Sequence, residues 1–369
     1  MTDYRRIAQA AGATAALLAV GAAAGVAAER TVVARSHRAD SEADEPFGRL
    51  RGTPVMVTDS LGGQIYAEIE ECTRPDPANL TLLFSHGYAL NQDCWHYQRR
   101  DLNSQGRLVF WDQRSHGRSA RSLAETNTIE QEGEDLFHVL TQVVPEGPVI
   151  LVGHSMGGMA TMAFAAAHPR LFRERVRGVA LLSTSSGGLN EITLGLPKPA
   201  ARIAHRVVPF VLPTLLRNAE IVDHGRARVS DLALLIARYY SYGPGVSPAL
   251  NDWSYRMISA TPIDVIAEFV PALEGHEKRA ALEVFSGVPG LVMVGADDRL
   301  TPMQHSVQMA DRMPKAHFEV VPDSGHMMLL ERYPLVNARL RELVRRVRAE
   351  LAGDPSAQAA PASTATTRA

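Results

Sequence analysis

The sequence is poor in cysteine, in excess charge of either sign and in metal-binding patterns, and each shortage excludes a class of protein. Cys72 and Cys94 are too few for a disulfide framework; they would pair only in an oxidising compartment, and two free thiols are the simpler expectation. The net charge of -2 at pH 7 gives no electrostatic reason to expect nucleic acid as a partner. The 13 histidines form neither an HExxH motif nor a zinc-like spacing with cysteine, so neither a metal nor another cofactor is expected.

The rest of the composition is that of a globular protein with ample apolar material for a core. Hydrophobic residues make up 46% of the chain and charged residues 21%. A length of 369 residues is large for one average domain, yet a single α/β domain with insertions can reach it.

The two ends of the chain differ from the middle. Residues 8–28 carry no charge and could span a bilayer, but they hold twelve alanines and only two leucines and two valines. The small residues before Glu29 are typical of a signal-peptide cleavage site, and an alanine-rich soluble helix is a third alternative. We expect residues 1–45 to be an anchor or signal with a linker, which makes the protein membrane-anchored or exported to the cell envelope, or cytoplasmic if the segment is neither. Residues 353–369 are small, polar and rich in alanine, and we expect a disordered tail.

Between the two ends, short apolar runs alternate with helical stretches, and this pattern predicts an α/β fold. Continuous apolar runs separated by helices are typical of a mostly parallel sheet covered by helices on both faces. TPVMVT and QIYAEIE, joined by LGG, predict an antiparallel pair at the start. The runs that predict parallel strands cover residues 80–87, 107–114, 148–155, 175–185, 290–298 and 316–326. The predicted helices cover residues 129–144, 156–168, 302–313 and 331–352.

The stretch VILVGHSMGGMATM predicts a strand, a tight turn and a helix, with Ser155 at the tip of the turn. Gly153 and Gly157 occupy the G-x-S-x-G positions, where a side chain would collide with the neighbouring strand or helix. The helix beginning at Met156 presents unpaired N–H groups, which favour negative charge near the serine oxygen. We interpret Ser155 as a nucleophile and His154 as a packed neighbour that is not the catalytic base.

A nucleophilic serine needs a base, an orienting acid and an oxyanion hole. One predicted strand ends in GADDRLTP, which contains Asp297 and Asp298, and the next ends in DSGHMMLLE, which contains His326. These follow the order Ser, Asp, His, and strand ends of this kind meet at the edge where open α/β sheets bind ligands. For the oxyanion hole we predict the backbone N–H groups of Tyr88, from FSHGYAL, and of Met156.

Five stretches resemble the motifs of the α/β-hydrolase family, in the family's order: SHGYALNQDCW, FWDQRSHGRS, VGHSMGG, VGADDRLTP and PDSGHMMLLERYP. The chain resembles this family from about Arg51 to Ala352, and is most similar to bacterial esterases and monoacylglycerol-lipase-like enzymes. The resemblance implies the α/β-hydrolase fold and structural roles for Asp112 and Arg114. The sequence departs from the pattern at Ser115, where the family more often has glycine.

The resemblance also selects the acid. In the related pattern a strand ends in glycine and the acid follows three residues later, so that Gly295 points to Asp298. The next helix is expected to begin at Thr301, because Thr301 and Gln304 fit a capping box and Pro302 suits the first helical turn. The predicted triad is therefore Ser155 with Asp298 and His326.

Helical sequence interrupts the sheet pattern over residues 187–286, and relatives carry a helical cap there. The predicted hydrolase core is thus divided into residues 46–186 and 287–352. Within the cap, residues 203–218 are apolar and interrupted by proline. They predict either packed cap core or an acyl-binding, membrane-facing wall.

These features predict a serine hydrolase that cleaves small-molecule carboxylic esters, with an apolar acyl group, through an acyl-enzyme intermediate. Haloalkane dehalogenases and epoxide hydrolases of this fold use aspartate where this chain has Ser155, so those activities are not expected. Thioesterase, C–C bond hydrolase and perhydrolase chemistry would use the same triad and stay open as alternatives. A non-catalytic ligand-binding protein is the alternative from a different class. Membrane association would follow if residues 8–28 or the cap contact lipid.

Overall fold

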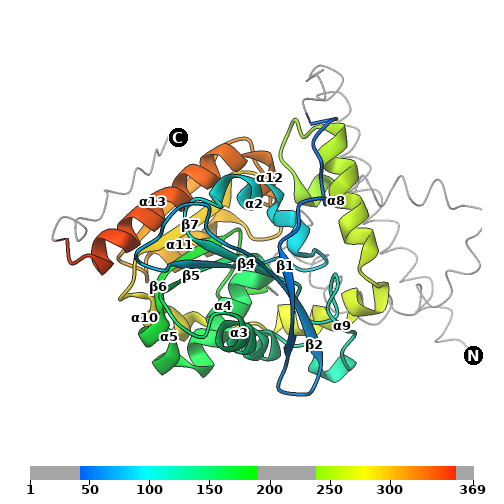
Figure 1. Cartoon of the computed structure of the whole chain (residues 1–369). Helices are drawn as coiled ribbons and strands as arrows, with labels where there is room; N and C mark the ends of the chain where they lie inside the picture. Colours follow the sequence, from blue (N-terminus) through cyan, green and yellow to red (C-terminus); the bar gives the residue numbers. More distant parts are fainter. Residues whose placement is uncertain (1–41, 190–237, 355–369) are drawn as a thin grey trace, which may run out of the picture.

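The computed structural model of the chain describes residues 42–189 and 238–354 (Figure 1). The apolar N-terminal segment 8–28, the apolar cap segment 203–218 and nearly all of the tail 353–369 lie outside the described residues.

The described residues form one sheet of eight strands, and its order confirms the predicted α/β architecture. The strands are β1 (Thr53–Thr58), β2 (Gln64–Glu70), β3 (Thr81–Ser85), β4 (Arg107–Trp111), β5 (Val149–His154), β6 (Val176–Leu182), β7 (Gly290–Gly295) and β8 (Ala316–Val321). Their order is β1-β2-β4-β3-β5-β6-β7-β8. The predicted hairpin of β1 and β2 is antiparallel and β2 also pairs antiparallel with β4, whereas every pairing from β4 to β8 is parallel.

Helices cover both faces of the sheet. They are α2 (His96–Leu102), α3 (Ile129–Val143), α4 (Met156–Ala167), α5 (Pro169–Arg175), α8 (Pro248–Ala260), α9 (Ile263–Glu274), α10 (Leu282–Phe285), α11 (Met303–Ala310), α12 (Met328–Glu331) and α13 (Tyr333–Leu351). Successive strand residues enter different cores: Leu82 belongs to the cluster that includes residues of α2, α8 and α13, and Leu83 to the cluster that includes residues of α3, α5 and α11. This alternation is the reason why the strands read as continuous apolar runs.

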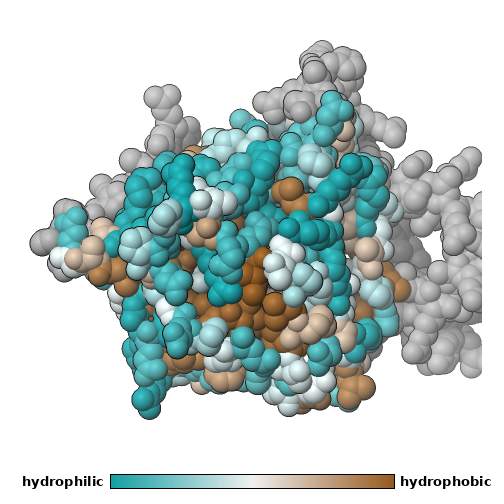
Figure 2. All heavy atoms as spheres, in the orientation of Figure 1, coloured by the Kyte–Doolittle hydropathy of each residue, from teal (hydrophilic) through white to brown (hydrophobic). Residues whose placement is uncertain are grey.

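The face shown in Figure 2 is largely hydrophilic, with an apolar area over α3 and α4. Among the described residues, exposed large apolar side chains are mostly scattered, such as Met56 on β1 and Leu123 before the short helix η2 (Ala124–Thr126), and only Met303 and Val307 share an element, α11. Single exposed residues of this kind are ordinary at a protein surface.

The predicted capping box at the start of α11 is wrong. The helix begins at Met303 after Pro302, and no side chain caps it. The hydroxyl of Thr301 donates a hydrogen bond to Asp298 Oδ2 at 2.8 Å instead. The residue directly before the helix is Pro302 and not Thr301, so Thr301 does not occupy the capping position, and its hydroxyl supplies a donor to a carboxylate whose burial would make an unpaired charge costly.

The N-terminal boundary of the domain lies earlier than the sequence suggests. The carboxylate of Glu42 accepts hydrogen bonds from the hydroxyls of Tyr97 and Ser247. Tyr97 is part of the core, and Ser247 is the residue directly before α8. Phe47 stacks on Trp253 of α8, with ring centroids 4.7 Å apart. Residues 42–45, which fall within the predicted linker, therefore belong to the folded domain.

The end of the predicted cap also belongs to the core. The short helix η5 (Arg279–Ala281) and α10 fall within the predicted cap 187–286, but they pack against α4 and α5. Phe285 is fully buried and stacks on Phe172 of α5 at 5.0 Å.

Both cysteines are free, as expected, with Cys94 buried and Cys72 partly exposed. Within residues 42–189 and 238–354, no helix is both long enough and apolar enough to cross a membrane. The same residues contain no cluster of three or more histidine, cysteine, aspartate or glutamate side chains able to hold a metal ion.

Candidate active site

Ser155 lies at the turn between β5 and α4 in the strained backbone conformation that the sequence predicts. Its φ of 51° and ψ of -119° lie on the positive-φ side, which residues with a Cβ rarely adopt. The backbone on both sides of the turn is held to β6 and the loop after it. The Ser155 N–H donates to Leu182 O at 3.0 Å, and the Thr184 hydroxyl donates to Ser155 O at 2.6 Å. The turn thus presents the serine at the carboxyl edge of the parallel strands.

The glycines around Ser155 are required by close packing. A Cβ on Gly153 would lie 2.6 Å from the Gly157 oxygen, and a Cβ on Gly157 would lie 2.1 Å from the Ser85 oxygen. Both distances are far below van der Waals contact with backbone atoms that cannot move away. The G-x-S-x-G spacing is therefore a packing requirement of this turn.

His326 and Asp298 meet across two loops. The His326 Nδ1 lies 3.0 Å from Asp298 Oδ2 and 3.1 Å from Oδ1, and both side chains are buried. Asp298 also accepts hydrogen bonds from the backbone N–H groups of Leu300 and Thr301 at 3.0 and 2.9 Å. Burial acts to raise the pKa of Asp298, but the imidazole of His326 and the Thr301 hydrogen bonds outweigh it and lower that pKa below its usual value. Asp298 is therefore held ionised.

Asp297 does not share this arrangement. Its N–H donates to Ser324 O at 2.9 Å and its residue is partly exposed. Among the described residues, His326 is hydrogen-bonded to the carboxylate of Asp298 and not to that of Asp297.

His154 connects the serine turn to the histidine loop. Its Nε2 donates to the backbone oxygen of His326 at 2.9 Å, and the two rings lie 4.9 Å apart. Burial lowers the pKa of His154 to about 3, so that the ring is neutral and serves as packing, as predicted. Within the described part of the chain, no hydrogen bond joins the Ser155 hydroxyl to His326, and contacts of this kind are often long or poorly aligned in enzymes without substrate.

The predicted oxyanion-hole residues lie on two segments that meet at Ser155. A Cβ on Gly87 would be 3.1 Å from the Ser155 Cβ and 2.8 Å from His154 Nδ1, so the chain before Tyr88 lies against the serine. Met156 is the first residue of α4, where helix geometry offers its N–H no acceptor. Backbone N–H groups of both residues are therefore available beside the serine side chain.

The side chain of Tyr88 does more than the sequence indicates. Its hydroxyl donates to the Ile266 carbonyl oxygen of α9 and so links the Tyr88 turn to a helix within the predicted cap 187–286. Burial raises the pKa of Tyr88 and keeps it a donor. An apolar cluster lies between α4 and α9 beside this contact, formed by Ile129, Met156, Met159, Ala163, Val265 and Phe269.

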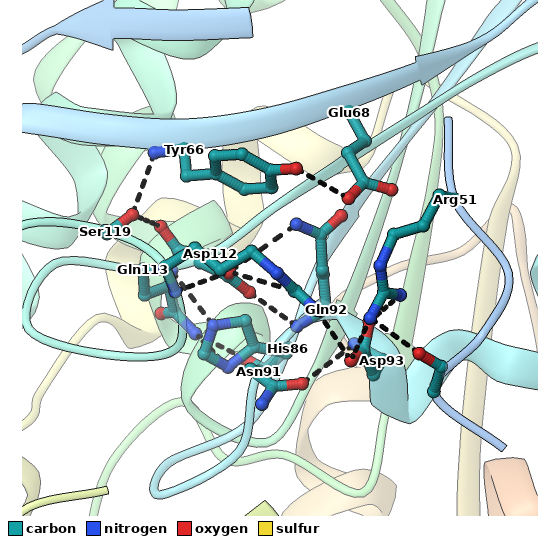
Figure 3. A network of polar contacts seen from close by, with 12 residues as sticks. Arg51, Tyr66, Glu68, His86, Asn91, Gln92, Asp93, Asp112, Gln113 and Ser119 are labelled. Carbon is teal, nitrogen blue, oxygen red and sulfur yellow. Dashed lines mark hydrogen bonds and ion pairs between the residues drawn. The ribbon is translucent and has the colours of Figure 1, made fainter. Parts of the chain in front are cut away.

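Asp112 holds two loops together behind the site (Figure 3). Its carboxylate accepts the backbone N–H groups of Gln92 at 2.7 Å and Arg118 at 2.9 Å. Burial raises the pKa of Asp112 to about 6 although these hydrogen bonds oppose the shift. Gln92 begins the short helix η1 (Gln92–Trp95), which follows the Tyr88 turn, so Asp112 fixes that turn from its far side.

Arg114 and Ser115 have structural contacts as well. The Arg114 guanidinium forms two hydrogen bonds with Asp135, at 2.6 and 2.7 Å, and a third with Asp59 at 3.1 Å, all in the buried interior. Ser115 has φ of 61°, which explains why glycine is common at this position in the family. The Ser115 hydroxyl accepts the Ser122 N–H at 3.0 Å, a contact that glycine would lack.

Two further residues support the loop that carries His326, and the sequence predicts this role for neither of them. Thr301 contacts Asp298, as described, and its hydroxyl lies 3.4 Å from His326 Nδ1. Glu331 accepts the N–H groups of Gly325 at 2.7 Å and Gly243 at 2.9 Å, and burial raises its pKa to about 7. The sequence feature that could have pointed to Glu331 is a single carboxylate at the end of MMLLE, whose other residues are apolar and buried.

Comparison with known proteins agrees with the fold and shows the family. Residues 76–333 match the family model described as serine aminopeptidase, S33. Methylesterase 8 of Arabidopsis thaliana is 36% identical over 259 residues, which cover 69% of this chain and 86% of that relative. Monoacylglycerol lipase of Mycolicibacterium smegmatis is 24% identical over 263 residues, which cover 69% of this chain and 84% of that relative. The solved structure of an esterase from Exiguobacterium antarcticum shares the fold, with a TM-score of 0.63, 19% identity, and coverage of 80% of this chain and 99% of that one.

Proposed function

Since the chain belongs to the serine aminopeptidase S33 family of α/β-hydrolases, we propose that it hydrolyses carboxylic esters with Ser155 as nucleophile. The observation that carries this proposal is the bond between His326 and Asp298, in a loop that His154 ties to the Ser155 turn. A base oriented by an ionised acid beside a strained serine is the arrangement that activates a hydroxyl.

The proposed reaction has two steps. In the first, Ser155 Oγ attacks the ester carbonyl while His326 takes the hydroxyl proton, and the N–H groups of Tyr88 and Met156 stabilise the oxyanion. The intermediate collapses to an acyl-enzyme, and His326 gives its proton to the departing alcohol. In the second, His326 removes a proton from water, whose oxygen attacks the acyl-enzyme. This intermediate collapses by breaking the bond to Ser155 Oγ, His326 returns its proton to that oxygen, and the carboxylic acid is released. Asp298 holds the imidazole with its proton on Nδ1 and stabilises the imidazolium in both steps.

We propose that the preferred substrates carry an apolar acyl group. The buried cluster between α4 and α9 supports this, because its side chains offer no polar partner beside the serine turn. The names of two relatives, a monoacylglycerol lipase and a methylesterase, are compatible with ester substrates.

A chain-length profile tests the substrate class. We expect kcat/KM on p-nitrophenyl esters to rise from acetate to octanoate and to exceed that on the matching thioesters. Phe269→Leu should lower octanoate turnover by about three- to tenfold and leave acetate turnover within twofold, because about one kcal/mol of apolar contact is lost. Phe285→Leu, which alters an equally buried phenylalanine that stacks on Phe172 in a different apolar cluster, should leave the ratio unchanged. Faster thioester turnover would make the protein a thioesterase, and equal losses on both esters would remove Phe269 from the acyl site.

Residues 8–28 support a proposal about location, in which they anchor the enzyme to a membrane or direct its export to the cell envelope. Deleting residues 1–41 should move the protein to the soluble fraction with its ester hydrolysis intact, because the described contacts of the domain begin at Glu42. Deleting residues 1–47 should lower the thermal unfolding midpoint by several degrees, since the stack of Phe47 on Trp253 is worth about 2 kcal/mol. Loss of folding after the shorter deletion would contradict this boundary.

A further inference from the structure

The peptide group between Gly87 and Tyr88 is held from its carbonyl side. The Gly87 oxygen accepts a hydrogen bond from His86 Nδ1 at 2.8 Å and another from the Leu90 N–H at 3.2 Å. In a trans peptide the C=O and N–H bonds point in opposite directions. Anchoring the Gly87 oxygen therefore also fixes the direction of the Tyr88 N–H, which belongs to the same planar group.

Two backbone contacts of the His86 ring select one tautomer, while the Gln113 side-chain nitrogen, 3.2 Å from Nδ1, donates to the backbone oxygen of His86. Its Nε2 lies 2.9 Å from the backbone N of Gln113, which can only donate, so Nε2 must carry no proton (Figure 3). The Gly87 oxygen can only accept, so Nδ1 must carry the proton. Burial lowers the pKa of His86 well below its usual value, and the nearby His116 adds to this, so that the ring stays neutral. His86 is consequently a fixed donor toward the Gly87 carbonyl.

A second neutral histidine occupies the next N–H group. His116 Nε2 accepts the N–H of Ala89 at 3.2 Å while its Nδ1 donates to Arg114 O at 2.8 Å. Ala89 has φ of 57°, a strained conformation that this hydrogen bond helps to maintain. Within the described residues the Ala89 N–H is thus used internally, whereas the N–H of Tyr88 donates to no protein acceptor.

We propose that His86 is a positioning residue of the oxyanion hole, whose Nδ1–H bond to the Gly87 carbonyl both aims the Tyr88 N–H at the substrate and strengthens it as a donor. This inference rests on the proposed function. The strengthening has a simple cause: an amide whose oxygen accepts a hydrogen bond is polarised, and its N–H becomes more positive. A single donor of an oxyanion hole contributes about 10²- to 10³-fold to kcat, and His86 controls part of that contribution.

Two substitutions separate the two nitrogen atoms of His86. His86→Asn keeps an amide N–H near the position of Nδ1, and His86→Gln keeps an oxygen near the position of Nε2. We expect the glutamine variant to lose about 10- to 100-fold in kcat with little change in KM, and the asparagine variant to stay within about fivefold of wild type. Affinity for a trifluoromethyl ketone, which forms an oxyanion with the serine, should fall in parallel with kcat. His168→Gln, which changes a partly exposed histidine bonded to Glu134, is the matched control.

The outcomes distinguish this inference from the proposed function. Ester hydrolysis by the wild-type enzyme tests the function itself, before any variant is compared. Equal kcat losses in both variants, or an unchanged affinity for the trifluoromethyl ketone in the glutamine variant, would overturn the role of His86. If either variant fails to fold, long-range ¹H–¹⁵N NMR correlations of the wild-type imidazole provide the test. A His86 proton on Nδ1 supports the proposal, and a proton on Nε2 overturns it.

Discussion

Ser155→Ala should lower kcat for ester hydrolysis by about four to six orders of magnitude and leave the fold intact, because no step of the proposed reaction proceeds without the hydroxyl. Alanine keeps the Cβ, so the strain of the positive φ at this turn is the same in both proteins. Steady-state kinetics on an activated ester and labelling by a fluorophosphonate both measure the loss. Retention of more than a tenth of the wild-type kcat would remove Ser155 from the mechanism.

Ser183→Ala is the matched control for this prediction. Ser183 is also buried and also has a positive φ, of 45°, and its hydroxyl has no hydrogen-bond partner among the described residues. Its replacement should therefore change neither labelling nor kcat by more than about twofold. A large loss in this control would show that removing a buried hydroxyl elsewhere in the core is enough to lower kcat, so the loss at Ser155 would no longer identify the nucleophile.

Asp298→Asn should lower kcat by about 10³- to 10⁴-fold, by reversing the tautomer of His326. The backbone N–H groups of Leu300 and Thr301 both donate to Oδ1, so the amide oxygen of asparagine would occupy that side. The amide nitrogen would then replace Oδ2 and face His326 Nδ1, which would have to accept a hydrogen bond. The imidazole proton would move to Nε2, and the ring could no longer accept the proton of the serine.

Asp297→Asn is the matched control for this prediction. Asp297 is partly exposed, and its described contact is a backbone hydrogen bond. The kcat of the Asp297→Asn variant should therefore stay within about tenfold of wild type. Steady-state kinetics of the two variants at pH 7 check the contrast. The opposite ranking would show that Asp297 is the acid.

Much of the fold could be predicted from the sequence because the deciding forces there are local and repetitive. Continuous apolar runs such as the one over β5 predict strands buried on both faces, and the structure confirms eight strands in a mostly parallel sheet. Gly153 and Gly157 predict a turn that only small residues allow, and the contacts at that turn confirm the reason. Periodicity likewise predicts α3 and α13 to within two residues at either end.

The pairing of side chains depended on the tertiary structure. A capping box at Thr301 is a sound local expectation, yet the helix begins after Pro302 and the Thr301 hydroxyl donates to the buried carboxylate of Asp298, whose ionisation depends in turn on His326. The link from Tyr88 to Ile266 joins residues 178 positions apart, and no local pattern predicts which carbonyl a buried hydroxyl will reach.

By itself, then, the sequence determined the α/β fold, the nucleophile turn and the family resemblance, because apolar periodicity and glycine spacing act within one element. The family pattern had already selected Asp298, but only the tertiary structure decided that residues 42–45 contact the domain and that His86 holds the peptide before Tyr88. Those pairings depend on how several elements pack together, since burial decides which polar groups must find a partner and geometry decides which partner is within reach.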